Sequence, residues 1–116
     1  MADNLQKDKL RLHHILEAIE ATDDFLAEIS KDAFDGNYEK QSAVIRQFEI
    51  IGEAASHLTP EFKKKYVVVD WPKVVGMRHK MIHDYFEVDT DIVWITAQND
   101  LPILKKQIKE ILKDLP

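Results

Sequence analysis

Apolar residues recur at the α-helical period through the first half of the chain. From about Asn4 to Ile29 they fall at spacings of three, four and seven, a pattern that predicts one long amphipathic helix. The run Asp35-Gly36-Asn37 breaks the pattern, and the same period resumes from Tyr38 to Leu58. We therefore expect a second long helix, antiparallel to the first if the link between them is a tight turn.

Helix-start signals divide the second half of the chain. Thr59-Pro60 combines an N-cap residue with proline at the first helical position, which predicts a short helix that ends near Tyr66. Asp70-Trp71-Pro72 repeats the signal and predicts a helix that runs to about His83. Between them, Val67-Val68-Val69 has strand propensity, but no second convincing strand is available to pair with it. We expect a buried connector there.

The last helix is predicted from Thr90, as its N-cap, to Lys113. Pro102 lies inside this segment and should kink it, because proline lacks a backbone N–H and its ring clashes with the carbonyl four residues earlier. Together the elements predict an all-α fold, an antiparallel bundle of about four to five helices. No repeat or long linker divides the sequence, so residues 1–116 are expected to form a single helical domain.

Composition excludes several kinds of protein. There is no cysteine, so neither a disulfide nor a thiolate metal site can form. No uninterrupted apolar run approaches the roughly 20 residues that a membrane-spanning helix needs, and the first residues lack the apolar core of a signal peptide. We therefore expect a soluble protein of the cytoplasm.

Charge is unevenly distributed along the chain. A formal net charge of −5 argues against a general affinity for nucleic acid. Residues 60–83, however, contain six lysine and arginine residues and only two acidic ones. The run Arg78-His79-Lys80-Met81-Ile82-His83-Asp84-Tyr85 overlaps the end of this basic segment. A guanidinium offers a fork of donors to phosphate oxygens, and an imidazole gives and takes protons near neutral pH, so the run is a candidate site for phosphate chemistry.

Helical geometry limits what one copy of this run could do. Arg78 and His83 are five residues apart, about 140° of rotation on a regular helix, so they would not share a face. They converge only if the helix frays near His83 or if a second molecule completes the site. Metal-free RNA cleavage by 2′-hydroxyl attack needs a base, an acid and cationic donors at the phosphate. A two-fold dimer with both copies of the run at its axis would supply two histidines and two arginines.

The pattern Arg78-x4-His83-x-Tyr85 resembles the Arg-x4-His-x-Tyr signature of the HepT-like toxins, which belong to the HEPN superfamily of helical nucleases. Two longer segments carry the same resemblance. Residues 46–55, which read Arg-Gln-Phe-Glu-Ile-Ile-Gly-Glu-Ala-Ala, are similar to the family's second helix. Residues 71–85 are similar to its catalytic helix and the exit from it. The resemblance therefore extends over most of the chain.

The resemblance implies an all-helical homodimer that acts as a metal-independent endoribonuclease toxin in a type VII-like toxin–antitoxin system. It implies no cofactor. The implied partner is a small MNT-type nucleotidyltransferase antitoxin, which attaches AMP to Tyr85. By position, Arg78 would bind and stabilise the phosphate, His83 would transfer protons, and His79 would support them. The residues expected to bind RNA are Lys73, which precedes this run, and Lys80, which lies within it.

Simpler interpretations stand beside these. Arg78 could be an exposed helix cation, His83 a complement to the helix dipole, and Tyr85 an ordinary packing aromatic. The spacing His79-x3-His83 is that of a two-histidine metal pair, but no Glu or Asp is arranged with it, which disfavours a metal site. The whole chain could also be a non-catalytic helical partner that the nucleotidyltransferase docks on or modifies.

Residues 46–55 also have a structural interpretation. Glu49 and Glu53 lie one helical turn apart, as a pair of carboxylates for acid and base work would, but Arg46 precedes them at helical spacing. This favours an ion-pair row along the helix. Gly52 in mid-helix costs roughly 1 kcal/mol relative to alanine, which indicates that another segment approaches the helix closely there.

Overall fold

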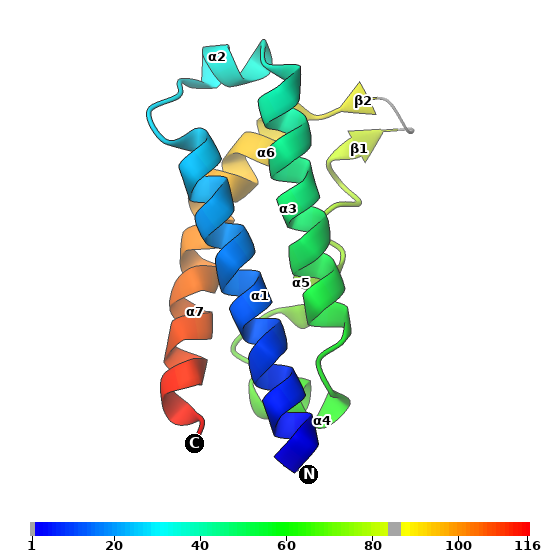
Figure 1. Cartoon of the computed structure of the whole chain (residues 1–116). Coiled ribbons are helices and arrows are strands. Elements are labelled where there is room, and N and C mark those ends of the chain that lie inside the picture. The colour runs from blue at the N-terminus through cyan, green and yellow to red at the C-terminus, as the bar shows by residue number, and fades with distance from the viewer. Residues whose placement is uncertain (1, 84–86) are drawn as a thin grey trace.

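The structure, a computed structural model, describes residues 2–83 and 87–116, with only the backbone described for Ala2 and His83. Helices form most of it, which confirms the predicted all-α class (Figure 1). The helices are α1 (Ala2–Leu26), α2 (Lys31–Asp35), α3 (Tyr38–Ser56), α4 (Pro60–Lys65), α5 (Trp71–Val75), α6 (Thr90–Ile95), the π-helical turn η1 (Thr96–Asp100) and α7 (Leu101–Asp114). Two short strands, β1 (Ile82–His83) and β2 (Glu87–Val88), complete the described elements.

The long helices α1 and α3 lie side by side and run in opposite directions, as the apolar pattern predicts (Figure 1). The link between them holds the short helix α2, which the sequence analysis missed. Ser30 caps α2 by accepting the N–H of Ala33, and Asn37 caps α3 by accepting the N–H of Lys40. Each cap satisfies a backbone donor that the helix leaves without an internal partner. The predicted break at residues 35–37 is therefore a helix end followed by a new helix start.

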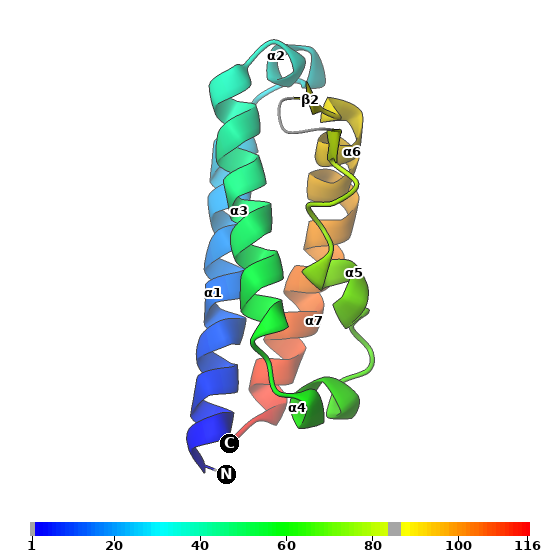
Figure 2. The same cartoon turned by 90° about the vertical axis from the view of Figure 1, so that its right-hand side faces the viewer.

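One hydrophobic core joins α1 and α3 to α6 and α7, which lie on the other side of the bundle (Figure 2). Apolar side chains three and four positions apart on each helix face inward, and burial of each contributes about 1.5–3 kcal/mol. The largest fully buried side chains include Leu12, Ile15 and Ile19 of α1, Phe34 of α2, Phe48 and Ile51 of α3, Met81 before β1, and Leu101 and Ile108 of α7. Among the described helices, none combines the length and apolar character required to cross a membrane.

The connector after α4 differs from the prediction. Helix α4 begins as expected, with Thr59 as its N-cap. The N–H of Val69 then donates to the carbonyl of Tyr66 at 3.3 Å, which closes a turn. Val69 is buried, but Val67 and Val68 are 76% and 65% exposed. The expectation of a buried connector is wrong for these two valines, because the turn projects them away from the core.

Tight turns and strand β1 replace the end of the predicted helix over residues 70–83. Strands β1 and β2 pair antiparallel, with Ile82 opposite Val88 and His83 opposite Glu87. Helix α5 starts at the predicted Asp70 cap but ends at Val75, so the prediction that it reaches His83 is wrong.

The C-terminal helical segment is capped one residue earlier than predicted and is irregular where proline required it. The side chain of Asp89, rather than Thr90, accepts a backbone N–H in the first turn of α6. Further along, the N–H of Leu101 donates to the carbonyl of Thr96, five residues back, in the π-helical turn η1. This wider turn directly precedes Pro102, which lies in the first turn of α7. The segment predicted as one helix is thus divided by a π turn that accommodates the missing N–H of Pro102.

Candidate active site beside α3

The segment that carries Arg78 and His79 is a series of tight turns. Gly76 caps α5, and three of the N–H groups that follow donate to carbonyls three residues earlier. His79 donates to Gly76 at 3.0 Å, and Met81 donates to Arg78 at 3.1 Å. Such bonds give about three residues per turn instead of 3.6. Because Met77 and Met81 are buried, the apolar residues that predicted a continuing helix instead anchor these turns to the core.

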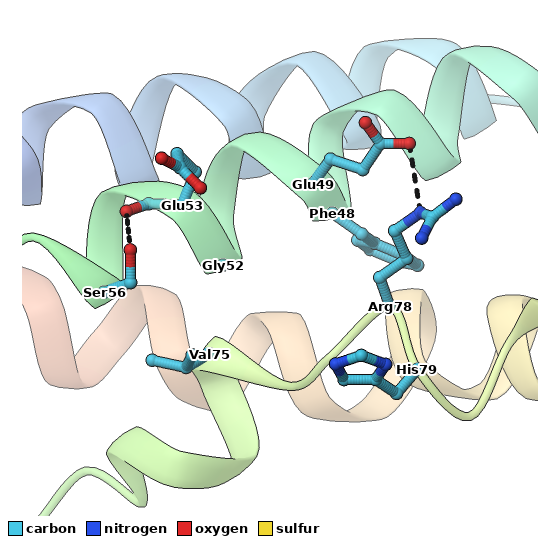
Figure 3. Close-up of a pocket in the computed structure, with 8 residues that line it drawn as sticks. All are labelled: Phe48, Glu49, Gly52, Glu53, Ser56, Val75, Arg78 and His79. Atoms are coloured by element: carbon cyan, nitrogen blue, oxygen red, sulfur yellow. Dashed lines mark hydrogen bonds and ion pairs between the residues drawn. The ribbon is translucent and has the colours of Figure 1, made fainter.

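Arg78 reaches from this segment to α3. Its Nε–H donates to Oε1 of Glu49 at 3.2 Å, and its side chain is half exposed (Figure 3). A guanidinium has five N–H donors, and the Glu49 contact uses one of them. The arginine can therefore bind a phosphate while its side chain remains anchored to Glu49.

Glu49 also contacts a second arginine. Its other oxygen, Oε2, lies 3.5 Å from Nη1 of Arg46, one turn earlier on α3. This contact confirms the first step of the ion-pair row expected along the helix. The row does not continue to Glu53, which pairs instead with His57 at 2.9 Å. Glu49 thus holds two guanidinium groups on its two oxygens.

A hollow of about 290 Å³ lies between α3 and the segment that follows α5. Its walls come from both elements, and the arginine and histidine side chains stand on the side opposite the glutamates (Figure 3). The lining residues are Phe48, Glu49, Gly52, Glu53, Ser56, Val75, Arg78 and His79.

Gly52 explains how α5 comes so close to α3. A Cβ atom at this position would lie 2.8 Å from the carbonyl oxygen of Val75, closer than real contacts allow. The close approach that its mid-helix position indicated is therefore confirmed. Arg78 follows Val75 by only three residues, so this close approach lies next to the contact between Arg78 and Glu49.

The other residues predicted for the site fall in different places. His79 lines the hollow beside Arg78, and Lys80 is exposed in the same turn segment. Lys73 lies elsewhere: its Nζ is 3.6 Å from Oδ2 of Asp100, and it lines a separate hollow between α5 and α7. The two lysines expected to bind RNA therefore do not line the Arg78 hollow.

His83 and Tyr85 are the two remaining residues of the predicted site. His83 belongs to β1, and its side chain lies outside what the structure describes, as does Tyr85 altogether. Neither Arg78 nor His83 is helical, so the expected 140° separation of the two residues around one helix does not exist. For the same reason, the one-turn spacing of His79 and His83 does not create a helical metal pair.

Sequence reasoning missed the contact between Glu49 and Arg78. The two residues are 29 positions apart. Only the packing of α5 against α3 brings them together, so no local spacing could indicate the pair. The available signal was Gly52, which marked the turn of α3 where a second segment had to pack.

The sequence matches a known protein family over most of its length. The model of the family described as "Ribonuclease HepT-like" matches residues 15–111, which include every residue of the hollow. The chain belongs to the HepT-like ribonuclease family. This confirms the family that the Arg78-x4-His83-x-Tyr85 pattern resembles and the predicted class of enzyme, an endoribonuclease.

Relatives of the HepT-like chain carry names of the same kind. A protein of Caldanaerobacter subterraneus subsp. tengcongensis, named "Putative RNase", is 41% identical over 102 residues, which are 88% of this chain and 91% of that protein. A "Probable ribonuclease HepT" of Thermococcus cleftensis is 39% identical over 88% of this chain and 93% of that protein.

A third relative is longer than this HepT-like chain. It is a protein of Methanocaldococcus jannaschii named "Gamma-glutamylcyclotransferase and putative RNase", 39% identical over 112 residues. The match covers 96% of this chain but only 50% of that protein, so the chain spans about half of its length. No solved structure gives a significant match.

Proposed function

We propose that this HepT-like chain is a metal-independent endoribonuclease in which Arg78 binds the scissile phosphate and His83 transfers protons. The observation that carries the proposal is the Arg78 side chain, which is anchored to Glu49 at the edge of a hollow and still half exposed. A fixed guanidinium stabilises the charge that builds up on a phosphate under attack.

The reaction that suits these groups is attack of a ribose 2′-oxygen on the adjacent phosphorus. One imidazole accepts the 2′-hydroxyl proton, the bond from phosphorus to the 5′-oxygen breaks, and a second imidazole donates a proton to that oxygen. His83 of one copy supplies one of the two roles. A homodimer with the site at its two-fold axis supplies both, and it also doubles Arg78 and His79.

We further propose that the chain is the toxin of a type VII-like toxin–antitoxin system. An MNT-type nucleotidyltransferase would neutralise it by transferring AMP from ATP to the Tyr85 oxygen, with release of pyrophosphate. Support comes from the place of Tyr85 two residues after His83 in the family pattern. Tyr85 is seven residues from Arg78 in the sequence, and the added phosphate would compete with substrate phosphate for this arginine if AMP is attached near it.

Incubation of the purified chain with total RNA in excess chelator tests the nuclease. The unsubstituted chain should cleave RNA, and His83→Ala should lose about 10²- to 10⁴-fold of the rate, as expected for loss of a general acid or base. Full activity of His83→Ala would contradict its role, and loss of wild-type activity in chelator would contradict the metal-free reaction. No cleavage by any form would favour the non-catalytic partner.

The regulatory step is tested separately with Tyr85→Phe. A phenol with a pKa near 10 is a poor base at neutral pH, so this variant should still cleave RNA. It should resist neutralisation when the nucleotidyltransferase and ATP are added, and its intact mass should stay unchanged. An AMP mass increment that persists in Tyr85→Phe would place the modification on another residue.

A further inference from the structure

A second hollow lies next to the candidate active site, on the side of α3 that faces α1. It has a volume of about 150 Å³ and is formed where α1 and α3 lie side by side (Figure 1). Its polar lining consists of Arg11 and His14 from α1 and Arg46, Glu53 and His57 from α3. Figure 2 shows α3 between α1 and α5, so the two hollows flank the same helix.

The two hollows are lined by arginine and not by lysine. The chain contains only three arginines, and all of them lie here: Arg78 in the first hollow, Arg11 and Arg46 in the second. Within the described part of the chain, no lysine lines either hollow. A guanidinium binds phosphate through paired N–H donors, whereas a lysine ammonium acts as a point charge. The arrangement therefore suits phosphate groups in particular.

The second hollow is connected to the first through shared residues. Glu49 contacts Arg78 with one carboxylate oxygen and Arg46 with the other, so the two guanidinium groups are neighbours across one side chain. Glu53 lines both hollows, which makes them adjacent along α3. A strand that places one phosphate on Arg78 can therefore continue over α3 toward Arg46 and Arg11.

The charges around this path favour an anion. Arg11, Arg46 and Arg78 stand against Glu49 and Glu53, three minus two, a net charge of +1. The hollow that Lys73 lines holds this one lysine against Asp70 and Asp100, one minus two, a net charge of −1, which disfavours an anion.

We propose that the hollow between α1 and α3 is a phosphate-binding subsite for single-stranded RNA, with Arg11 and Arg46 contacting backbone phosphates beside the one bound at Arg78. The subsite rests on the proposed nuclease function. It adds the path that the bound RNA strand follows away from Arg78. The RNA crosses α3 toward α1 instead of following the lysines of α4 and α5.

Binding of a labelled single-stranded RNA oligonucleotide tests the subsite. The measurements use the full chain with His83→Ala, so that the RNA stays intact, and compare Arg11→Gln with Lys109→Gln, an exposed cation of α7. Arg11→Gln should weaken binding several-fold, and the slope of log affinity against log salt should fall by about 0.7, the value for one phosphate contact on a single strand. Lys109→Gln should change neither quantity. Arg11→Lys should restore part of the affinity, because it keeps the charge but loses the paired donors.

The outcomes separate this subsite from the nuclease itself. Equal affinity and salt slope in Arg11→Gln and Lys109→Gln would overturn the subsite, whether or not the unsubstituted chain cleaves RNA. If the unsubstituted chain binds RNA through Arg11 but does not cleave it, the nuclease proposal fails and the phosphate-binding surface stands. Absence of RNA binding altogether would overturn both.

Discussion

At the scale of single residues, the decisive contact is the one between Arg78 and Glu49. Arg78 lies in a turn, and the carboxylate of Glu49 on α3 holds the end of its long side chain. An exposed ion pair of this kind contributes only about 0–1 kcal/mol to stability. Its effect on the proposed catalysis should be larger, because a small misplacement of a group that binds the transition state can lower the rate strongly. We therefore propose that Glu49 is a positioning residue for Arg78.

Glu49→Gln should lower the kcat for RNA cleavage about 10- to 100-fold while the free energy of unfolding changes by less than about 1 kcal/mol. The amide keeps the size of the side chain but not the charge that fixes Arg78. Glu39→Gln, at an exposed glutamate in the first turn of the same helix, is the control and should leave kcat unchanged. Equal kcat values in the two variants would show that Glu49 does not position Arg78.

At the scale of elements, the site depends on how closely α5 packs on α3. The missing side chain at Gly52 lets the carbonyl of Val75 approach the helix, and the turns that follow then carry Arg78 over the hollow. At the far end of the bundle, Tyr66 after α4 donates from its hydroxyl to Asp114 of α7 at 2.8 Å. These two contacts hold residues 66–75 at both ends, against α7 at Tyr66 and against α3 at Val75.

Gly52→Ala should reduce activity even though alanine is the better helix former. The gain in helix propensity is about 1 kcal/mol, whereas pushing the Val75 backbone away costs about 1–3 kcal/mol. The expected result is a net loss of up to about 2 kcal/mol in urea unfolding and a lower kcat, because Arg78 moves away from Glu49. Gly36→Ala serves as the control, since its new Cβ would meet neighbours only at 3.9 Å. Normal activity of Gly52→Ala would show that the close contact between Gly52 and Val75 is not needed for cleavage.

The contact of Tyr66 with Asp114 should make stability fall in alkaline solution. Burial and then the Asp114 hydrogen bond raise the pKa of Tyr66 from 10.0 to about 12. Because the unfolded phenol loses its proton first, this contribution is complete below pH 10 and is lost as pH rises to about 12. Tyr66→Phe should show a smaller drop in its urea midpoint across that window than the unsubstituted chain. Tyr38→Phe, at a tyrosine that is 74% exposed, should show the full drop.

At the scale of the whole molecule, the proposed chemistry requires two copies of the chain. Metal-free cleavage needs a proton acceptor and a proton donor, and one copy offers a single His83. The hollow beside α3 is open at the surface and presents Arg78 and His79 there, where a symmetric partner could add its own groups. The site would then be shared between the two copies.

Mixed dimers provide the corresponding measurement. Heterodimers of the unsubstituted chain with Arg78→Ala, purified through different affinity tags, should keep less than half of the activity of the unsubstituted dimer, because each composite centre lacks one arginine. Two independent sites would leave half of the activity. A monomer that sedimentation shows to be fully active would refute the shared site.

The sequence by itself determined the long helices, the starts of α4 and α5, and the chemical character of the candidate site. Apolar periodicity and caps such as Thr59 and Asp70 act over a few residues, so they can be read from local order. The Arg78-x4-His83-x-Tyr85 pattern indicated the family in the same way. The order of residues did not decide where α5 ends. Met77 and Met81 have the spacing of a helix, but they are buried in the core from a series of turns.

Only the tertiary structure decided which side chains meet. The pairing of Glu49 with Arg78, the separation of Lys73 from their hollow, and the gathering of all three arginines around α3 depend on packing between distant elements. Each follows from the close fit of α5 on α3 at Gly52 and of α1 along α3. Such contacts arise when helices bury their apolar faces together, and that docking has no counterpart in the spacing of residues along the chain.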